Sequence, residues 1–94
     1  MTRSSISIEK RNDDVFEVTV VDSITTTHEV TITDQSLSDF SENNVTKTQL
    51  LEFSFRFLLD REPNTSILSS FDINVISRYF SNYKDEVRRW CDEN

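Results

Sequence analysis

The spacing of apolar residues changes once along this chain, and that change limits the possible folds more than any other feature. In residues 4–33 apolar side chains recur at every second position, which is typical of strands with one buried face. In residues 46–91 they recur at helical spacing. Strands followed by helices, each type in its own part of the chain, indicate an α+β fold.

Three strands separated by short polar turns are expected in residues 4–33. The positions expected on the buried face are Ile6 and Ile8, then Phe16, Val18 and Val20, then Val30 and Ile32 with His28 on the same face. The chain contains no glycine, so we expect Asn and Asp to form the turns, because they tolerate left-handed backbone better than other residues. Short turns favour an antiparallel meander with one face in solvent.

A long helix is expected to begin after Thr46. Thr46 and Gln49 have the spacing of a capping box, in which each side chain bonds the other residue's backbone amide. No breaker interrupts residues 47–61, and Pro63 ends the run. Apolar side chains cover most of the circumference, which indicates a central helix or one at a dimer interface.

The remaining segments complete the expected fold. Residues 34–40 could form a short helix and residues 41–44 a loop. A second helix is expected after Asp72, with an interruption at residues 81–82 and a continuation toward the C-terminus. We therefore predict one domain over residues 1–94: a three-stranded antiparallel meander followed by two or three helices packed on one face, with strands in 4–33 and a helical half in 46–91.

The charge of the chain is acidic and uneven. It carries 17 acids and 10 bases, a formal net charge of −7, and nine of the acids but only three bases lie in residues 1–46. Nucleic-acid backbones are bound through Lys and Arg, so DNA and RNA are not expected partners. Mimicry of nucleic acid stays open and would require the nine acids to share one face. A net charge of this size is also ordinary for solubility.

The sequence predicts a cytoplasmic protein with no membrane partner. Residues 1–5 lead directly into the strand pattern, with no apolar run that could be a signal peptide or a span. The single cysteine, Cys91, excludes a disulfide framework and fits a reducing compartment.

Few side chains in this sequence could carry chemistry. His28 is the only histidine, and as a general base it would need a nucleophile and an orienting carboxylate. Cys91 could be that nucleophile, but nothing in the sequence brings the two together, and no metal-ligand spacing occurs. We therefore expect no catalytic residue, no metal site and no cofactor. The alternative is a small-ligand-binding protein or enzyme with a pocket near His28.

Aromatic residues are dense in the second half of the chain, where eight of the ten lie between Phe53 and Trp90. A three-stranded sheet cannot cover the wide arc over which such rings fan out on one helix. Most should be core, and an exposed remainder would mark a binding surface. The candidate interaction residues are Phe53, Phe57, Tyr79, Tyr83 and Trp90. The sequence thus predicts a non-enzymatic interaction or regulatory module that binds a protein partner or self-associates as a homodimer.

One segment resembles a known group of proteins. Residues 57–68 read Phe-Leu-Leu-Asp-Arg-Glu-Pro-Asn-Thr-Ser-Ile-Leu. Together with residues 27–33 and 50–83, they resemble short bacterial proteins that share a Phe-Leu-Leu-x-Arg-Glu-Pro-Asn-x-Ser-Ile-Leu segment. The chain departs from that pattern at Ser81, where a proline is expected. The resemblance implies a small bacterial cytoplasmic protein and transfers no catalytic residues. It also makes the polar turn at 61–66 a candidate recognition corner.

Overall fold

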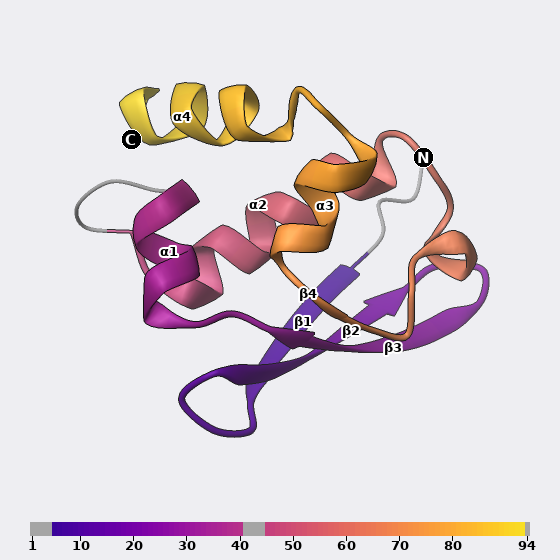
Figure 1. The fold of residues 1–94 in the computed structure, drawn as a ribbon. Helices are drawn as coiled ribbons and strands as arrows, with labels where there is room; N and C mark the ends of the chain where they lie inside the picture. The colour runs from indigo at the N-terminus through magenta and orange to yellow at the C-terminus, as the bar shows by residue number, and fades with distance from the viewer. Residues whose placement is uncertain (1–4, 41–44, 94) are drawn as a thin grey trace.

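The computed structural model describes residues 5–40 and 45–93 and shows a sheet with helices on one side (Figure 1). The elements in chain order are β1 Ser5–Lys10, β2 Val15–Val21, β3 Thr25–Thr31, α1 Asp34–Phe40, α2 Lys47–Leu59, the 3₁₀ turn η1 Asn64–Ser66, β4 Ser70–Asp72, α3 Asn74–Tyr79 and α4 Tyr83–Glu93. The class is α+β, as the change in apolar spacing predicts.

The sheet has four strands in the order β1-β2-β3-β4. The first three are antiparallel, which confirms the meander. The fourth runs parallel to β3 and places Phe71 opposite Val30. The expected three-stranded sheet is therefore corrected to a mixed sheet of four strands. Because β4 has only three residues, its sequence carries too short a pattern to indicate a strand.

An asparagine forms the first turn, as the absence of glycine predicts. The Asn12 side-chain oxygen Oδ1 accepts hydrogen bonds from the backbone N–H groups of Asp14 and Val15, both at 2.9 Å. A side chain that bonds the backbone two and three residues ahead stabilises a tight turn locally. This turn joins β1 to β2.

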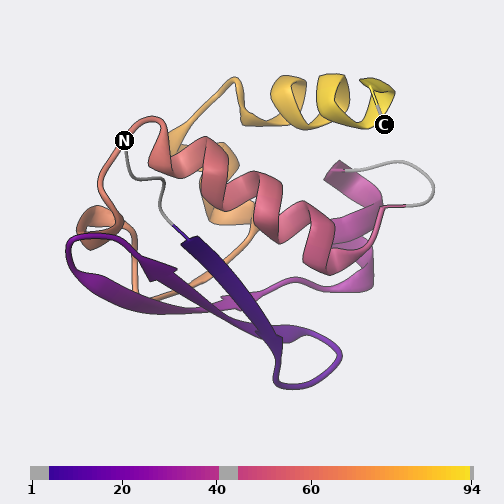
Figure 2. The same cartoon turned by 180° about the vertical axis from the view of Figure 1, so that it is seen from behind.

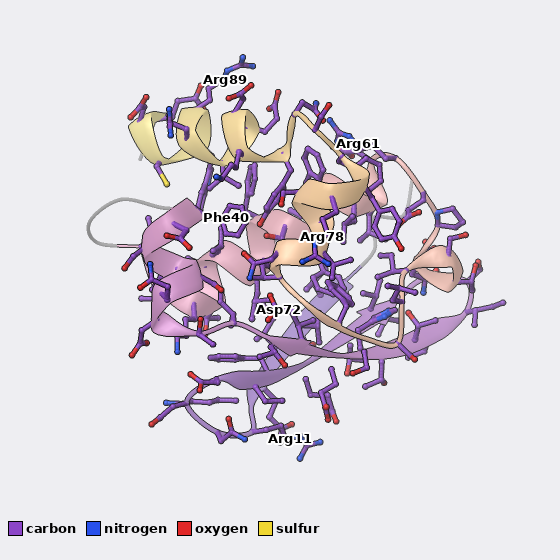
Figure 3. All side chains as sticks on the ribbon, in the orientation of Figure 1. Arg11, Phe40, Arg61, Asp72, Arg78 and Arg89 are labelled. Carbon is purple, nitrogen blue, oxygen red and sulfur yellow. The ribbon has the colours of Figure 1, made fainter. Side chains whose placement is uncertain are left out.

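Alternate strand residues divide the sheet into a covered face and an open face. Phe16, Val18 and Val20 of β2 are buried, whereas Glu17 and Thr19 between them are only partly so. Figures 1 and 2 show the four helices on the side of the sheet that these apolar residues face. In Figure 3, Arg11 lies below the sheet, on the side away from the helices, whereas Arg89 lies on α4 above it.

The helix α2 is the centre of the core. Thr46 is its N-cap, and both hydrogen bonds of the capping box with Gln49 are present, which confirms the predicted start. Its side chains Leu50, Leu51 and Phe55 are completely buried between the sheet and the other helices. A helix buried on several sides is what its wide apolar arc predicts.

The other helices number three, so the expected two or three helices are corrected to four in the described part of the chain. The short helix α1 forms where the spacing allowed one. The interruption at residues 81–82 is confirmed, since α3 ends at Tyr79 and α4 begins at Tyr83. The loop expected at residues 41–44 lies outside the described residues. None of the described helices is both long and apolar enough to cross a membrane.

Candidate functional site

An apolar cavity lies where the end of α2, the η1 turn, β4 and α3 meet. It has a volume of about 420 Å³. Its buried apolar wall consists of Leu58, Ile67, Phe71 and Ile76, with Phe80 and Val75 partly buried beside them. Leu68, Tyr79, Glu62 and Ser66 complete the lining. We call this cavity the Tyr79 groove.

Two large apolar side chains stand exposed at the Tyr79 groove. Leu68 is 49% exposed and Tyr79 is 70% exposed. Only two further large hydrophobic residues of the described chain are comparably exposed, Val21 and Ile24, and neither lines the groove. Exposed apolar groups that border a cavity, rather than stand singly, are typical of a binding surface.

The turn after α2 shapes one side of the groove. Residues 61–68, which we call corner 61–68, leave the helix beyond its C-cap Asp60, because Pro63 lacks the N–H that would continue it. Asn64 then turns inward and is 4% exposed. Its Nδ2 donates to the Ile24 carbonyl at 2.7 Å and to Thr26 Oγ1 at 3.0 Å. These bonds hold the corner against the hairpin of β2 and β3.

The charged side chain in the groove is Glu62, which is partly buried. Its neighbour Arg61 lies with its guanidinium carbon 3.6 Å from the Phe57 ring centroid and donates to the Phe57 carbonyl at 3.0 Å. Among the described side chains, no basic group forms an ion pair with Glu62. The groove therefore presents an apolar wall with one unneutralised carboxylate.

His28 lies in a different place, behind corner 61–68. It is 2% exposed, and its ring packs against Phe55 with centroids 5.4 Å apart. Its Nδ1 lies 2.7 Å from the Leu68 carbonyl oxygen and its Nε2 lies 2.8 Å from Thr26 Oγ1. A carbonyl only accepts, so Nδ1 donates to Leu68, and in the neutral ring Nε2 then accepts from the Thr26 hydroxyl. Both ring nitrogens are thus occupied by the protein itself.

Neither cavity described here includes His28 in its lining. The pocket expected near this residue stays a prediction. What the geometry does give His28 is a structural contact, because its hydrogen bond to the Leu68 carbonyl connects β3 to the end of corner 61–68. Together with Asn64, it forms a chain of side-chain bonds that we call the Asn64–His28 clip.

Four of the five aromatic residues expected at an interaction surface pack against one another, since Phe57 lies 6.5 Å from Phe53 and 5.3 Å from Tyr83 between ring centroids, and Phe53 contacts Trp90. Phe57 and Tyr83 are buried, at 5% and 0% exposure. Phe53 and Trp90 are partly buried and stack on each other, with ring centroids 4.8 Å apart and planes 19° apart. Of the five, only Tyr79 is largely exposed.

The buried Tyr83 hydroxyl is matched by a partner in α2. It lies 2.5 Å from Ser54 Oγ, which in turn donates to the Leu50 carbonyl at 2.7 Å. Since the Ser54 proton goes to Leu50, the Tyr83 hydroxyl donates to Ser54. Burial raises the pKa of Tyr83 above its ordinary value, although the hydrogen bond to Ser54 acts in the opposite direction. This contact belongs to the core.

A second cleft, of about 490 Å³, lies at the start of α2 beside the first turn and α1. Lys47, whose side chain is 12% exposed, lies against it and bonds the Asp13 carbonyl at 2.5 Å. Its Nζ also lies 2.9 Å from Asp34 Oδ1 and 3.4 Å from Asp14 Oδ1. Burial alone would lower the pKa of Lys47, but the two carboxylates outweigh it and the pKa is raised. Lys47 thus acts as a brace between three segments.

The acids of the strands form a row rather than a metal site. Glu9 lies opposite Glu17, and Glu17 lies opposite Glu29, all on the open face of the sheet. Arg11 contacts both Glu17 and Glu9. No group of three or more His, Cys, Asp or Glu residues within the described ranges could hold a metal ion. Cys91 is a free, partly buried thiol.

Two signals in the sequence relate to the Tyr79 groove, and one part of it was missed. The turn at 61–66 was identified as a candidate corner, and Tyr79 as an interaction residue. Glu62 lies within that turn but nothing in the sequence singles it out, and Leu68 lies beyond the turn, because a polar turn residue and a single leucine carry no distinctive spacing. Comparison with known proteins adds no family: this chain matches no family model, no curated protein and no solved structure.

Proposed function

We propose that this protein is a non-enzymatic interaction module that binds a protein partner through the Tyr79 groove. The observation that carries the proposal is the pair of exposed side chains, Leu68 and Tyr79, at a cavity of about 420 Å³ with a buried apolar wall. Interface hot spots are enriched in tyrosine and centre on pockets that a partner's side chain can fill.

The charge of the groove supports a partner that carries basic residues. Glu62 has no basic partner among the described side chains, and the whole chain carries a net charge of −7. We expect the partner segment to insert an apolar side chain and to place Lys or Arg next to it. The apolar side chain would pack against the wall of the groove, and the basic group would pair with the Glu62 carboxylate. Complementary charge raises association rates and selects partners, while the apolar side chain supplies most of the affinity.

The polar groups of the groove support binding rather than bond breaking. They consist of one carboxylate and the hydroxyls of Ser66 and Tyr79. The only histidine lies behind corner 61–68 with both ring nitrogens engaged. The proposal locates the module in the cytoplasm of a bacterium, which is what the resemblance of residues 57–68 and the single thiol imply.

A displayed library of random peptides tests the proposal directly. We expect the enriched peptides to contain a large apolar residue beside Lys or Arg. By fluorescence anisotropy, Tyr79→Ser should weaken their binding about ten-fold or more, the range of an interface hot spot. Ile24→Ser is the matched control, since Ile24 is 60% exposed and lies outside the groove. Peptides that bind Tyr79→Ser as tightly as the unaltered protein would contradict the proposal.

The role of Glu62 is tested with the same peptides. Glu62→Gln keeps the size of the side chain and removes the charge, so it should weaken peptides that contain Lys or Arg and leave uncharged ones unchanged. Glu52→Gln removes a charge from the exposed side of α2 and should change neither. Equal effects of the two substitutions would show that only the net charge of the protein matters.

A further inference from the structure

The outer edge of β1 is a separate surface with its own chemistry. β1 pairs with β2 through six successive residues, without a bulge, from Ser5 opposite Val21 to Lys10 opposite Phe16. On its other side, no strand in the described part of the chain pairs with it. Figure 2 shows β1 on the near side of the sheet, below α2. Unprotected edges of this kind are templates for pairing with another chain.

The hydrogen-bonding pattern determines which groups of β1 point outward. The Arg11 N–H donates to the Val15 carbonyl at 2.9 Å, so this pair is of the hydrogen-bonded type. Hydrogen-bonded pairs alternate along an antiparallel ladder, which makes Ser5, Ser7 and Glu9 the residues bonded to β2. The N–H and C=O groups of the residues between them, Ile6, Ile8 and Lys10, therefore point away from the sheet.

The other side of β2 supports this assignment independently. The Ile32 N–H donates to the Asp14 carbonyl at 2.6 Å, which makes that pair hydrogen-bonded. By the same alternation, the even-numbered residues of β2 bond β3. Its odd-numbered residues, such as Glu17 and Thr19, are left to bond β1, as the first argument requires.

The outward groups of β1 match those of a second copy. An antiparallel pair of β1 strands with its two-fold axis at Ile8 places Ile8 opposite Ile8 of the second copy. It also places Ile6 opposite Lys10 of the second copy, so every outward N–H and C=O of β1 finds a partner. This register sets Ser7 opposite Glu9 of the second copy on the open face, with no like charges directly opposed.

Other registers for pairing the outer edges of two β1 strands are less favourable. An axis at Glu9 would place the Glu9 carboxylates of the two copies directly opposite each other, which is destabilising. An axis at Ser7 would leave the outward groups of Lys10 without partners from the described part of β1. The axis at Ile8 also brings together two partly buried isoleucines that already pack at the margin of the core.

We infer that the outer edge of β1 is a self-association surface, on which a second copy of this chain extends the sheet antiparallel about a two-fold axis at Ile8. The inference does not depend on the Tyr79 groove, which lies among α2, β4 and α3 at the other end of the strand order. Failure of the peptide-binding proposal would leave it unaffected.

Size exclusion with light scattering and hydrogen exchange test this inference on the unaltered protein. We expect the mass to rise toward twice that of one chain between low-micromolar and near-millimolar concentration. Over the same range the amides of Ile6, Ile8 and Lys10 should become protected, while those of Ser7 and Glu9 are protected throughout. A monomeric mass at every concentration would overturn the inference. So would a dimer in which the three outward amides stay unprotected.

A matched pair of variants isolates the backbone contact. Lys10→Pro removes an outward N–H at an edge position that tolerates proline, whereas Lys10→Ala removes the same exposed side chain and keeps the N–H. Because two hydrogen bonds are lost per dimer, Lys10→Pro should weaken association about ten-fold or more relative to Lys10→Ala. Equal association of the two variants, both folded by circular dichroism, would overturn the inference.

Discussion

The two sides of corner 61–68 differ in how their side chains are satisfied. On the inner side, Asn64 and His28 form an unbroken chain of hydrogen bonds from the Ile24 carbonyl to the Leu68 carbonyl. On the outer side, Leu68 and Tyr79 stand exposed beside an apolar wall. One short segment is therefore closed by polar contacts on one side and left open by apolar groups on the other.

This difference shows how a turn without regular structure can carry a binding surface. A loop costs conformational entropy to order, and a buried loop must satisfy its own backbone groups. The Asn64–His28 clip meets both requirements from the inner side, so the outer side need not contribute to stability. Substitutions on the inner side should therefore lower the free energy of unfolding, and those on the outer side should affect only binding.

The largest effect is expected at Asn64. In Asn64→Asp the size is unchanged, but a charged acceptor replaces the amide that donates to Ile24 and Thr26. An unpaired buried charge facing a carbonyl should lower the free energy of unfolding by about 3 kcal/mol. Urea denaturation would measure it. Thr65→Asp is the matched control, because it adds the same charge at the exposed neighbouring residue and should cost little.

A smaller loss is expected at the other end of the clip. His28→Leu removes the donor to the Leu68 carbonyl and the acceptor for the Thr26 hydroxyl. With an apolar residue in its place, the free energy of unfolding should fall by about 2 kcal/mol. Thr27→Ala, on the exposed neighbouring position of β3, should be nearly neutral. Equal midpoints for these two variants would mean that the clip contributes nothing to stability.

The inner and outer sides also differ in how far the sequence predicts them. The strands of 4–33 and the start of α2 follow from local patterns, since alternation and a capping box depend only on nearby residues. The clip joins His28 and Asn64 to groups 40 residues away, so no local pattern could indicate it. The sequence does not predict β4 for the same reason, because the pairing of β4 with β3 is long-range.

The sequence predicts one residue of the candidate site, Tyr79, and the position of the turn beside it. Tyr79 was expected at an interaction surface, and the turn at 61–66 was expected to connect two apolar segments. Phe57 and Tyr83 have the same aromatic character as Tyr79 but are buried, at 5% and 0% exposure. Helical spacing alone cannot separate them, because the burial of each ring depends on which helix packs against it.

A third prediction concerns the core contact between α4 and α2. As in the clip, the buried polar groups of this contact form hydrogen bonds with one another. Tyr83→Phe removes the hydroxyl that donates to Ser54. Because Ser54 keeps its bond to the Leu50 carbonyl, the expected cost is about 1 kcal/mol at neutral pH. Thermal denaturation would measure it, and a loss as large as that of Asn64→Asp would contradict this account.

The same contact should also affect how the stability of the protein changes at alkaline pH. Tyr83 and Lys47 both have folded-state pKa values above their ordinary values of 10.0 and 10.5. Above pH 10 the unfolded chain therefore releases protons that the folded chain still holds, so stability falls as the pH rises. Tyr83→Phe should make this fall shallower than in the unaltered protein. Identical slopes would show that the buried hydroxyl does not contribute to the pH dependence.

The smallest effect is expected on the outer side, where Tyr79→Ser should change the free energy of unfolding by no more than about 0.5 kcal/mol. The side chain is 70% exposed, so its removal takes little contact from the folded chain. Val87→Ala, in the neighbouring helix α4, offers the contrast, because Val87 is completely buried and its truncation should cost more. A large loss of stability in Tyr79→Ser would mean that the ring stabilises the fold and is not available to bind a partner. Retained stability together with lost peptide binding would separate the two sides of the corner, one for folding and one for recognition.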